Sequence, residues 1–222
     1  MGAVAPSGRG RGRPSGHEAV LSTEDLLDAA LDAFAERGYD GTSVREVARR
    51  LGVSHNLIPQ RVGPKEQLWF AAVDHGFEAL SADLAATAEA GADLDDVEQL
   101  RALVTAFVAA NARRPALLRI INQEAVADGP RLDHLFVRYI DPVRQYGADV
   151  LARLEAEGRV RSGSVGLVYF LMTHGAGGPV ALPGLAARFG EAVDPADEEA
   201  VQRHAEAATA AIFDGLLVPG DN

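Results

Sequence analysis

The chain has 222 residues, of which 47% are hydrophobic and 24% are charged, a balance typical of an ordinary soluble globular protein. It contains no cysteine, which excludes disulfides, thiolate metal sites and thiol redox sensing. No apolar run is long enough to span a membrane, and the N-terminal arginines are not followed by the apolar stretch of a secretory signal. We therefore expect a cytoplasmic protein with no membrane partner.

The formal net charge of -11 argues against non-specific DNA binding by the whole surface. The charge is unevenly distributed along the chain. Residues 1–80 hold nine basic and eleven acidic residues, whereas residues 81–222 hold twelve basic and twenty-one acidic ones. The first region is therefore nearly balanced, and the excess of negative charge belongs mostly to the second.

The first 17 residues contain three arginines, five glycines and no acidic residue. They offer little apolar surface to bury, so we expect a disordered arm over residues 1–20. The run from Arg11 to Pro14 resembles an AT-hook, which makes Arg11 and Arg13 candidates for contacts in an A·T-rich minor groove. A solvated tail is the other interpretation.

The next pattern predicts a helix from about Thr23 to Arg37, with Ser22 as its N-cap and Gly38 as its stop. Tyr39 then either packs in a core or contacts a phosphate.

Two shorter helices follow, separated by a tight turn. Ser43 and Glu46 have the spacing of a capping box, and Gly52 stands where a left-handed residue ends a helix. The last helix is expected from about His55 to Arg61, capped by Ser54. A helix, a short glycine-containing turn and a second helix form the helix-turn-helix arrangement, whose second helix enters the DNA major groove.

This stretch resembles the DNA-binding domain of the TetR family of transcriptional regulators. The resemblance is carried by LLDAALDAFAERGYDGTSVREVARRLGVS and, after the turn, by GPKEQLWFAAV, including the frame of Phe34, Gly38, Tyr39 and Thr42. The resemblance implies that the protein binds its operator as a dimer, and that a variable helical ligand-binding domain follows the DNA-binding domain. The chain departs from the family in having Pro59 where an aromatic residue is usual and Val62 in place of Phe. Because Pro59 has no N–H, we expect the second helix to be kinked or shortened.

The candidate DNA contacts have polar or basic side chains on the outward face of the second helix or at helix starts, with one leucine for a thymine methyl. Besides Arg11 and Arg13 they are Thr42, Ser43, Arg45, Ser54, His55, Asn56, Leu57, Gln60, Arg61 and Lys65.

The rest of the chain has the periodicity of helices and no strand pattern. A long helix is expected from Lys65 to about Ala88, with Pro64 at its first position. Further helices are expected over 95–113, 116–126, 131–157 with a bend at Pro142, 165–174 and 196–217. The fold class is therefore all-α: a three-helix helix-turn-helix DNA-binding domain over residues 21–80, then a helical-bundle ligand-binding and dimerisation domain over residues 81–222.

Polar or aromatic side chains that interrupt apolar helices are candidates for a ligand pocket, although each is also compatible with a packed core. They are Asn111, Asn122, Glu124, His134, Tyr139, Tyr169 and His174. The helix over 165–174 is apolar nearly all round and must be buried. With the last helix it resembles the family's dimer interface, for which the candidates are Val168, Phe170, Leu171, Ala207, Ala211, Phe213 and Leu217. Intrachain packing is the alternative.

No histidine spacing indicates a metal site, and no catalytic or cofactor motif is recognisable, so we expect neither an enzyme nor a cofactor. We expect a regulator, most simply a repressor, that binds a palindromic DNA operator as a homodimer and is released by a small molecule. The alternative is an architectural DNA-binding protein without sequence preference.

Overall fold

A computed structural model describes residues 21–163 and 165–218. The regular structure of this part is helical, apart from one isolated bridge between Val160 and Leu217. The elements in chain order are α1 (Thr23–Gly41), α2 (Val44–Arg50), α3 (Leu57–Arg61), α4 (Lys65–Ala90), α5 (Asp96–Arg113), α6 (Pro115–Ala127), α7 (Pro130–Leu135), η1 (Phe136–Ile140), α8 (Asp141–Ala156), α9 (Val165–Phe170), η2 (Leu171–Ala176), α10 (Gly178–Ala181), α11 (Pro183–Phe189) and α12 (Glu198–Leu216).

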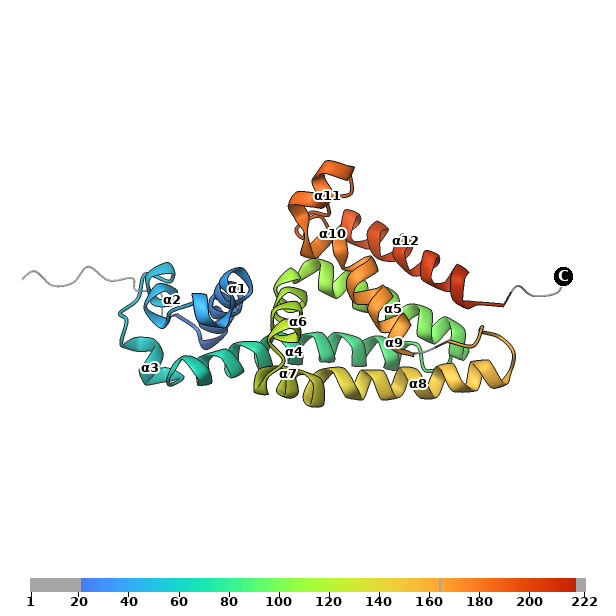
Figure 1. Cartoon of the computed structure of the whole chain (residues 1–222), viewed down its shortest axis with the longest axis horizontal. Coiled ribbons are helices and arrows are strands. Elements are labelled where there is room, and N and C mark those ends of the chain that lie inside the picture. The colour runs from blue at the N-terminus through green and yellow to red at the C-terminus, as the bar shows by residue number, and fades with distance from the viewer. Residues whose placement is uncertain (1–20, 164, 219–222) are drawn as a thin grey trace, which may run out of the picture.

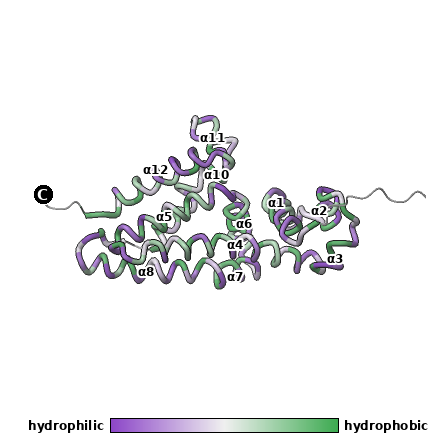
Figure 2. The backbone as a smooth tube through the Cα atoms, turned by 180° about the vertical axis from the view of Figure 1, so that it is seen from behind, coloured by the Kyte–Doolittle hydropathy of each residue, from purple (hydrophilic) through white to green (hydrophobic). Residues whose placement is uncertain are grey.

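Helices α1 to α3 form a small unit at one end of an elongated molecule, and α4 leads from it into a larger helical bundle (Figure 1). We call these parts the N-terminal unit and the bundle. Polar and apolar residues alternate along the bundle helices α8 and α12 (Figure 2), as expected for helices that bury one face. No helix within the described ranges is long and apolar enough to cross a membrane.

The predicted start of α1 is confirmed. The Ser22 hydroxyl accepts a hydrogen bond from the Asp25 N–H at 2.9 Å, and the Asp25 carboxylate reaches back to Ser22 in a complete capping box. Gly38 has φ of +72°, which ends the regular helix as expected, although one further turn continues to Gly41.

The start of α2 forms only half of its predicted capping box. The Ser43 hydroxyl accepts from the Glu46 N–H at 3.2 Å, as expected. The Glu46 carboxylate, however, faces Arg37, Arg49 and Arg50 rather than the Ser43 N–H, because these three guanidinium groups compete for it. Gly52 has φ of +67°, the left-handed conformation that the turn requires.

Helix α4 is 26 residues long, about 39 Å at the rise of an α-helix. Pro64 is its N-cap, with extended ψ of 169°, so the expected first-position proline lies one residue further out. Its buried face includes Leu68, Trp69, Val73 and Phe77.

Two clusters of buried residues fill the molecule. The first runs without a break from α1, α2 and α3 through α4 to α6 and α7, so the N-terminal unit and the near end of the bundle share one core. The second cluster lies among α5, α8, α9 and α12.

The structure adds three details to the expected course of the bundle helices. The helix over 131–157 is divided into α7, the π-helical segment η1 and α8; η1 ends just before Pro142, which has no N–H for the Arg138 carbonyl. The connection after residue 174 contains two short helices, α10 and α11, which are too short to show a period. The helix over 165–174 becomes π-helical at Leu171, and the chain itself buries only part of it: Val168 and Thr173 are buried, whereas Phe170 is 59% exposed.

Candidate DNA-binding surface and ligand cavity

The second helix of the helix-turn-helix, α3, has five residues instead of the predicted seven. Pro59 cannot donate to His55, so the first intrahelical bond in this segment runs from the Gln60 N–H to the Asn56 carbonyl at 3.2 Å. Ser54 does not cap α3; its carbonyl accepts from the Leu57 N–H at 2.9 Å in the preceding turn. The prediction of a shortened helix is confirmed.

The outward residues of this segment lie as the pattern predicted. Ile58 is fully buried, with Val53 and Val62 partly buried beside it. The exposed candidates are Ser43, Arg45, Ser54, His55, Asn56, Gln60 and Arg61, whereas Leu57 and Lys65 are partly buried. Asn56 and His55 therefore present their side chains from the turn that enters α3 rather than from a helical turn.

The Thr42 side chain is buried and belongs to the fold. Its hydroxyl oxygen lies 2.8 Å from the Gly38 carbonyl oxygen and 3.0 Å from that of Ala33. A hydroxyl committed to these carbonyls does not reach a phosphate, so we withdraw the Thr42 side chain as a DNA contact. Arg61 is exposed, but its Nη1 donates to the Leu21 carbonyl at 2.6 Å, which gives it a structural role as well.

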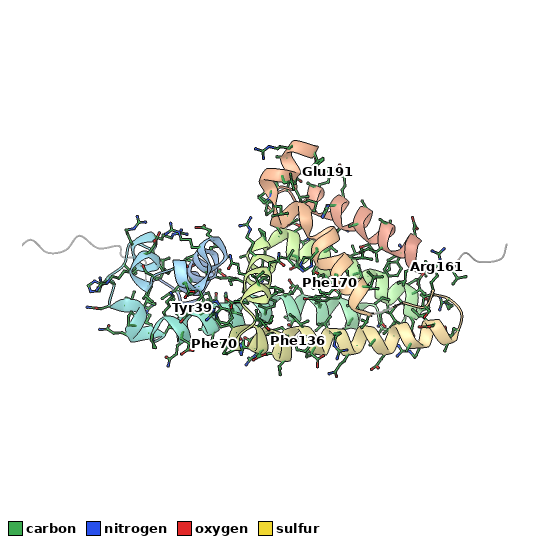
Figure 3. The ribbon with its side chains drawn as sticks, viewed as in Figure 1. Tyr39, Phe70, Phe136, Arg161, Phe170 and Glu191 are labelled. Carbon is green, nitrogen blue, oxygen red and sulfur yellow. The ribbon has the colours of Figure 1, made fainter. Side chains whose placement is uncertain are left out.

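Tyr39 packs against the core rather than standing free. Its ring stacks on Phe34 with centroids 6.1 Å apart, Lys65 Nζ lies 4.4 Å from its centroid, and the Arg131 guanidinium lies 4.0 Å from it. Figure 3 places Tyr39 where the N-terminal unit meets the bundle. Arg131 belongs to α7 of the bundle, and Lys65 is a candidate phosphate contact. The Tyr39 ring therefore makes cation–π contacts with both of these side chains.

Some basic side chains of α1 and α2 form ion pairs with carboxylates, and others do not. Arg50 donates to Glu36 at 2.6 Å, and this hydrogen bond holds the pKa of the Glu36 carboxyl below its ordinary value. Arg37 and Arg49 pair with Glu46. Arg45 forms no ion pair with any described residue. The open positive charge next to α3 is therefore Arg45, with Lys65 at the start of α4.

The bundle contains a cavity of about 360 Å³ between α4, α5, α8 and α9. Of the seven predicted pocket residues, Tyr139 and Tyr169 line it. Asn111 lines a smaller adjoining space, where its amide donates to the Phe107 carbonyl at 2.8 Å. The walls are otherwise mostly aliphatic and aromatic, as is usual for a small-molecule site.

The other four predicted pocket residues lie elsewhere. Glu124 is buried and accepts from Arg131 at 2.8 Å, and His134 lies 2.7 Å from Asp74. His174 is exposed and stands against Phe170. Asn122 is partly buried on α6 and lines neither space.

Sequence reasoning missed Asp74 and Arg131, which connect the parts of the molecule. Asp74, on α4, accepts a 2.7 Å hydrogen bond from the Tyr139 hydroxyl, and its Oδ1 also lies 2.7 Å from His134 Nε2. These partners are sixty or more residues away from Asp74, and no local spacing signals such contacts.

A groove of about 600 Å³ runs between α9, η2 and α12. Four of the predicted interface residues are exposed near it or on it, namely Phe170, Leu171, Ala207 and Ala211. Val168 and Phe213 are buried in the second cluster, although Val168 also lines the floor of the groove, and Leu217 is partly buried beside the cluster.

Comparison with known proteins agrees with this geometry. Residues 26–72 match the model of the bacterial regulatory proteins of the tetR family. Residues 26–72 therefore form a DNA-binding domain of the tetR family, whose members are transcriptional regulators.

Among curated relatives, the transcriptional repressor Rv3405c of Mycobacterium tuberculosis is 45% identical over 65 residues, which cover 29% of this chain and 34% of the relative. The repressor AcnR of Corynebacterium efficiens is 37% identical over 57 residues, 26% of this chain and 30% of the relative. The match thus spans about a third of the length of these relatives.

The fold match extends much further than the sequence match. The ketosteroid transcriptional regulator KstR2 of Mycobacterium tuberculosis superposes with a TM-score of 0.69 over 90% of this chain and 97% of its own, at 24% identity. A putative fatty acid metabolism regulator of Clostridium perfringens superposes with a TM-score of 0.64 over 87% and 98%, at 17% identity. At such identities the likeness concerns the fold.

Proposed function

We propose that this protein is a transcriptional repressor that binds a palindromic operator as a homodimer and leaves it when a small, largely apolar ligand enters the bundle. The observation that carries the proposal is the arrangement around α4. This one helix begins at Lys65, beside the exposed residues of α3, and its far half lines the 360 Å³ cavity. The repressors that match the N-terminal unit support the direction of control.

DNA binding is assigned to the exposed side of α3 and the turn before it. Asn56 and Gln60 have the amide groups that pair with adenine edges, whereas Arg45 and Lys65 supply charge for phosphates. The domain boundaries expected from the sequence, at residues 20 and 80, are compatible with DNA binding by residues 21–80 and ligand binding by the residues that follow. Arg11 and Arg13 lie outside the described residues, and their minor-groove role stays a prediction.

The homodimer is assigned to the exposed apolar surface of α9, η2 and α12. Phe170 and Leu171 are 59% and 43% exposed, and large apolar side chains next to a groove are typical of an interaction surface. A dimer formed through this surface would have to present its two α3 segments to half-sites about 34–36 Å apart, one helical turn of DNA.

Ligand release needs a route from the cavity to the DNA-binding surface. The Tyr139 ring lines the cavity, and its hydroxyl bonds to Asp74 on α4. In addition, Arg131 stacks on Tyr39, whose ring also contacts Lys65 at the start of α4. A ligand that displaces Tyr139 would therefore bias the position of α4, provided that it prefers the non-binding conformation.

The test is selection of the full-length protein on randomised DNA duplexes, followed by binding titrations of the selected and scrambled sequences over a range of salt. We expect a selected imperfect palindrome that binds at least 1,000-fold more tightly than its scrambled version, about the lower limit for specific recognition. Enrichment of no sequence, with equally salt-sensitive binding to every duplex, would favour the architectural alternative instead.

A further inference from the structure

The cavity between α4, α5, α8 and α9 is lined by hydroxyl groups as well as by apolar side chains. Four hydroxyl groups belong to residues that line it, and three of them donate to protein atoms. Ser81 donates to the Phe77 carbonyl at 2.8 Å, Tyr139 to Asp74 at 2.7 Å and Tyr146 to Gln99 at 3.0 Å. The fourth hydroxyl, that of Tyr169, has no hydrogen-bond partner among the described residues.

The Tyr169 hydroxyl is a neutral donor under physiological conditions. Burial alone raises its pKa to about 12, because the apolar surroundings disfavour the phenolate. Tyr169 lines both the main cavity and the small extension that reaches Asn111, so it stands where the two spaces join. A donor left without an acceptor in apolar surroundings costs free energy that a bound acceptor recovers.

The charged groups of the cavity disfavour an ionic ligand. The charged side chains that line it are Arg138 and Arg144. Each already has a carboxylate: Arg138 donates to Glu78 at 2.7 Å, and Arg144 donates to Asp141 at 2.7 Å. An anionic ligand would have to compete with these carboxylates, and a cationic ligand would find no carboxylate among the described lining residues.

We propose that the cavity binds a neutral, largely apolar molecule with one hydrogen-bond-accepting oxygen, and that the Tyr169 hydroxyl donates to this oxygen. At about 360 Å³ the cavity lies at the small end of ligand sites, which run from about 300 to 1,000 Å³. This inference rests on the proposed function in taking the cavity as the effector site, and it adds the chemical class of the effector and the residue that selects it.

The test uses three probes of one shape on the full chain at pH 7.5, measured by titration calorimetry. These are 2-acetylnaphthalene, which carries an accepting oxygen, 2-ethylnaphthalene, which lacks it, and 2-naphthoate, which is anionic at this pH. We expect 2-acetylnaphthalene to bind roughly three- to tenfold more tightly than 2-ethylnaphthalene, the worth of one net hydrogen bond, and 2-naphthoate to bind weakest.

Tyr169→Phe keeps the apolar volume and removes the donor. It should abolish the preference for 2-acetylnaphthalene while leaving the affinity for 2-ethylnaphthalene unchanged. Tyr146→Phe is the matched control, because its hydroxyl already donates to Gln99, and it should keep the preference. Equal affinities of the two neutral probes for the unaltered protein, a preference that survives Tyr169→Phe, tightest binding of 2-naphthoate, or no binding of any probe would each overturn the proposal.

The failure of the proposed function would look different. A Tyr169-dependent preference for 2-acetylnaphthalene, combined with an operator affinity that this probe does not alter at saturation, would establish the binding site and leave it without a role in release. An operator complex that the probe dissociates, with no dependence on Tyr169, would instead support ligand-controlled DNA binding and remove Tyr169 as the selecting residue.

Discussion

The N-terminal unit and the bundle differ in what they share with other proteins. Sequence identity to the curated relatives reaches 45%, but only over 65 residues, whereas the similarity to KstR2 at 24% identity covers 90% of the chain. The N-terminal unit therefore resembles other proteins in sequence, whereas the bundle resembles them only in fold. A DNA-binding surface must hold a few side chains at fixed positions, whereas a ligand cavity must only remain enclosed while its lining varies.

The packing of the two parts shows the same difference. The N-terminal unit and the first turns of α4 are filled by large side chains with no exposure, including Phe34, Ile58 and Trp69. The bundle contains a cavity flanked by two π-helical segments: η1 contributes Arg138 and Tyr139 to its lining, and η2 contributes Met172. Such segments are frequent at functional sites, because the irregular backbone redirects side chains.

The largest expected effect tests whether the two parts fold as one. Phe34→Ala should lower the free energy of unfolding by about 3–5 kcal/mol, since the ring is fully buried in the cluster that runs from α1 to α7. Urea unfolding followed by circular dichroism and by the fluorescence of Trp69, the sole tryptophan, should show both signals shifting together. A shift of the fluorescence transition alone would show that the N-terminal unit unfolds independently of the bundle.

The second prediction concerns the exposed surface of the bundle. Phe170→Glu should yield a monomer in sedimentation experiments and weaken operator binding by about 100-fold or more, because the two DNA-binding surfaces lose their linkage. Val126→Glu is the matched control, since Val126 is 89% exposed at the end of α6, outside the groove. Phe213 is unsuitable for this test because it is buried in the chain's own core. A monomeric Phe170→Glu protein that binds the full palindrome at unaltered strength would contradict the dimer.

The third prediction separates two kinds of DNA contact within the N-terminal unit. Asn56→Ala and Gln60→Ala should each cost about 1–3 kcal/mol at the operator and little on scrambled DNA, because base contacts carry sequence information. Lys65→Ala should weaken binding to both and reduce the salt slope by about one. Unchanged discrimination in both amide variants would show that bases are read by other residues.

Much of the N-terminal unit could be predicted from the sequence, because its helix starts and turns depend on local signals. Ser22, Ser43 and Gly52 act over three or four residues, and each lies where the pattern placed it. The buried hydroxyl of Thr42 could not be recognised, since its acceptor at Ala33 is nine residues away on the other side of a turn. The same holds for Asp74, whose partners come together only when α7 and η1 fold against α4.

The bundle was less predictable for a related reason. Helical periodicity locates the long helices but not their surroundings. For the apolar segment 165–174 it left both a dimer interface and intrachain packing open, and only the structure shows that Phe170 is exposed on the chain's own surface. The cavity is likewise invisible in the sequence, because its residues come from several helices and only their packing leaves the space. The two tyrosines that do line it were chosen together with five polar residues that do not line the main space.

The smallest expected effect is a difference between the two parts in acid. In the bundle, the pKa of Glu198 is lowered by its hydrogen bond with Arg113, and that of Asp96 by its hydrogen bond with Arg153. The pKa of Asp95 is also lowered, chiefly because its carboxylate accepts from the Glu98 N–H at the start of α5. A carboxyl whose pKa is lower in the folded state stabilises the fold above its unfolded pKa of about 4, and this contribution is lost as the pH falls through the folded value.

In the N-terminal unit the corresponding effects oppose one another. Glu36 has a lowered pKa through Arg50, but burial raises the pKa of Asp32, whose contribution changes in the opposite direction with pH. Acidification below about pH 4 should therefore loosen the starts of α5 and α12 before α1 and α2. Amide hydrogen exchange at pH 6 and pH 3.5, corrected for intrinsic rates, measures this order. Glu198→Gln should remove the pH dependence at the start of α12 only, and equal loosening of α1 and α12 in the unaltered protein would contradict the assignment.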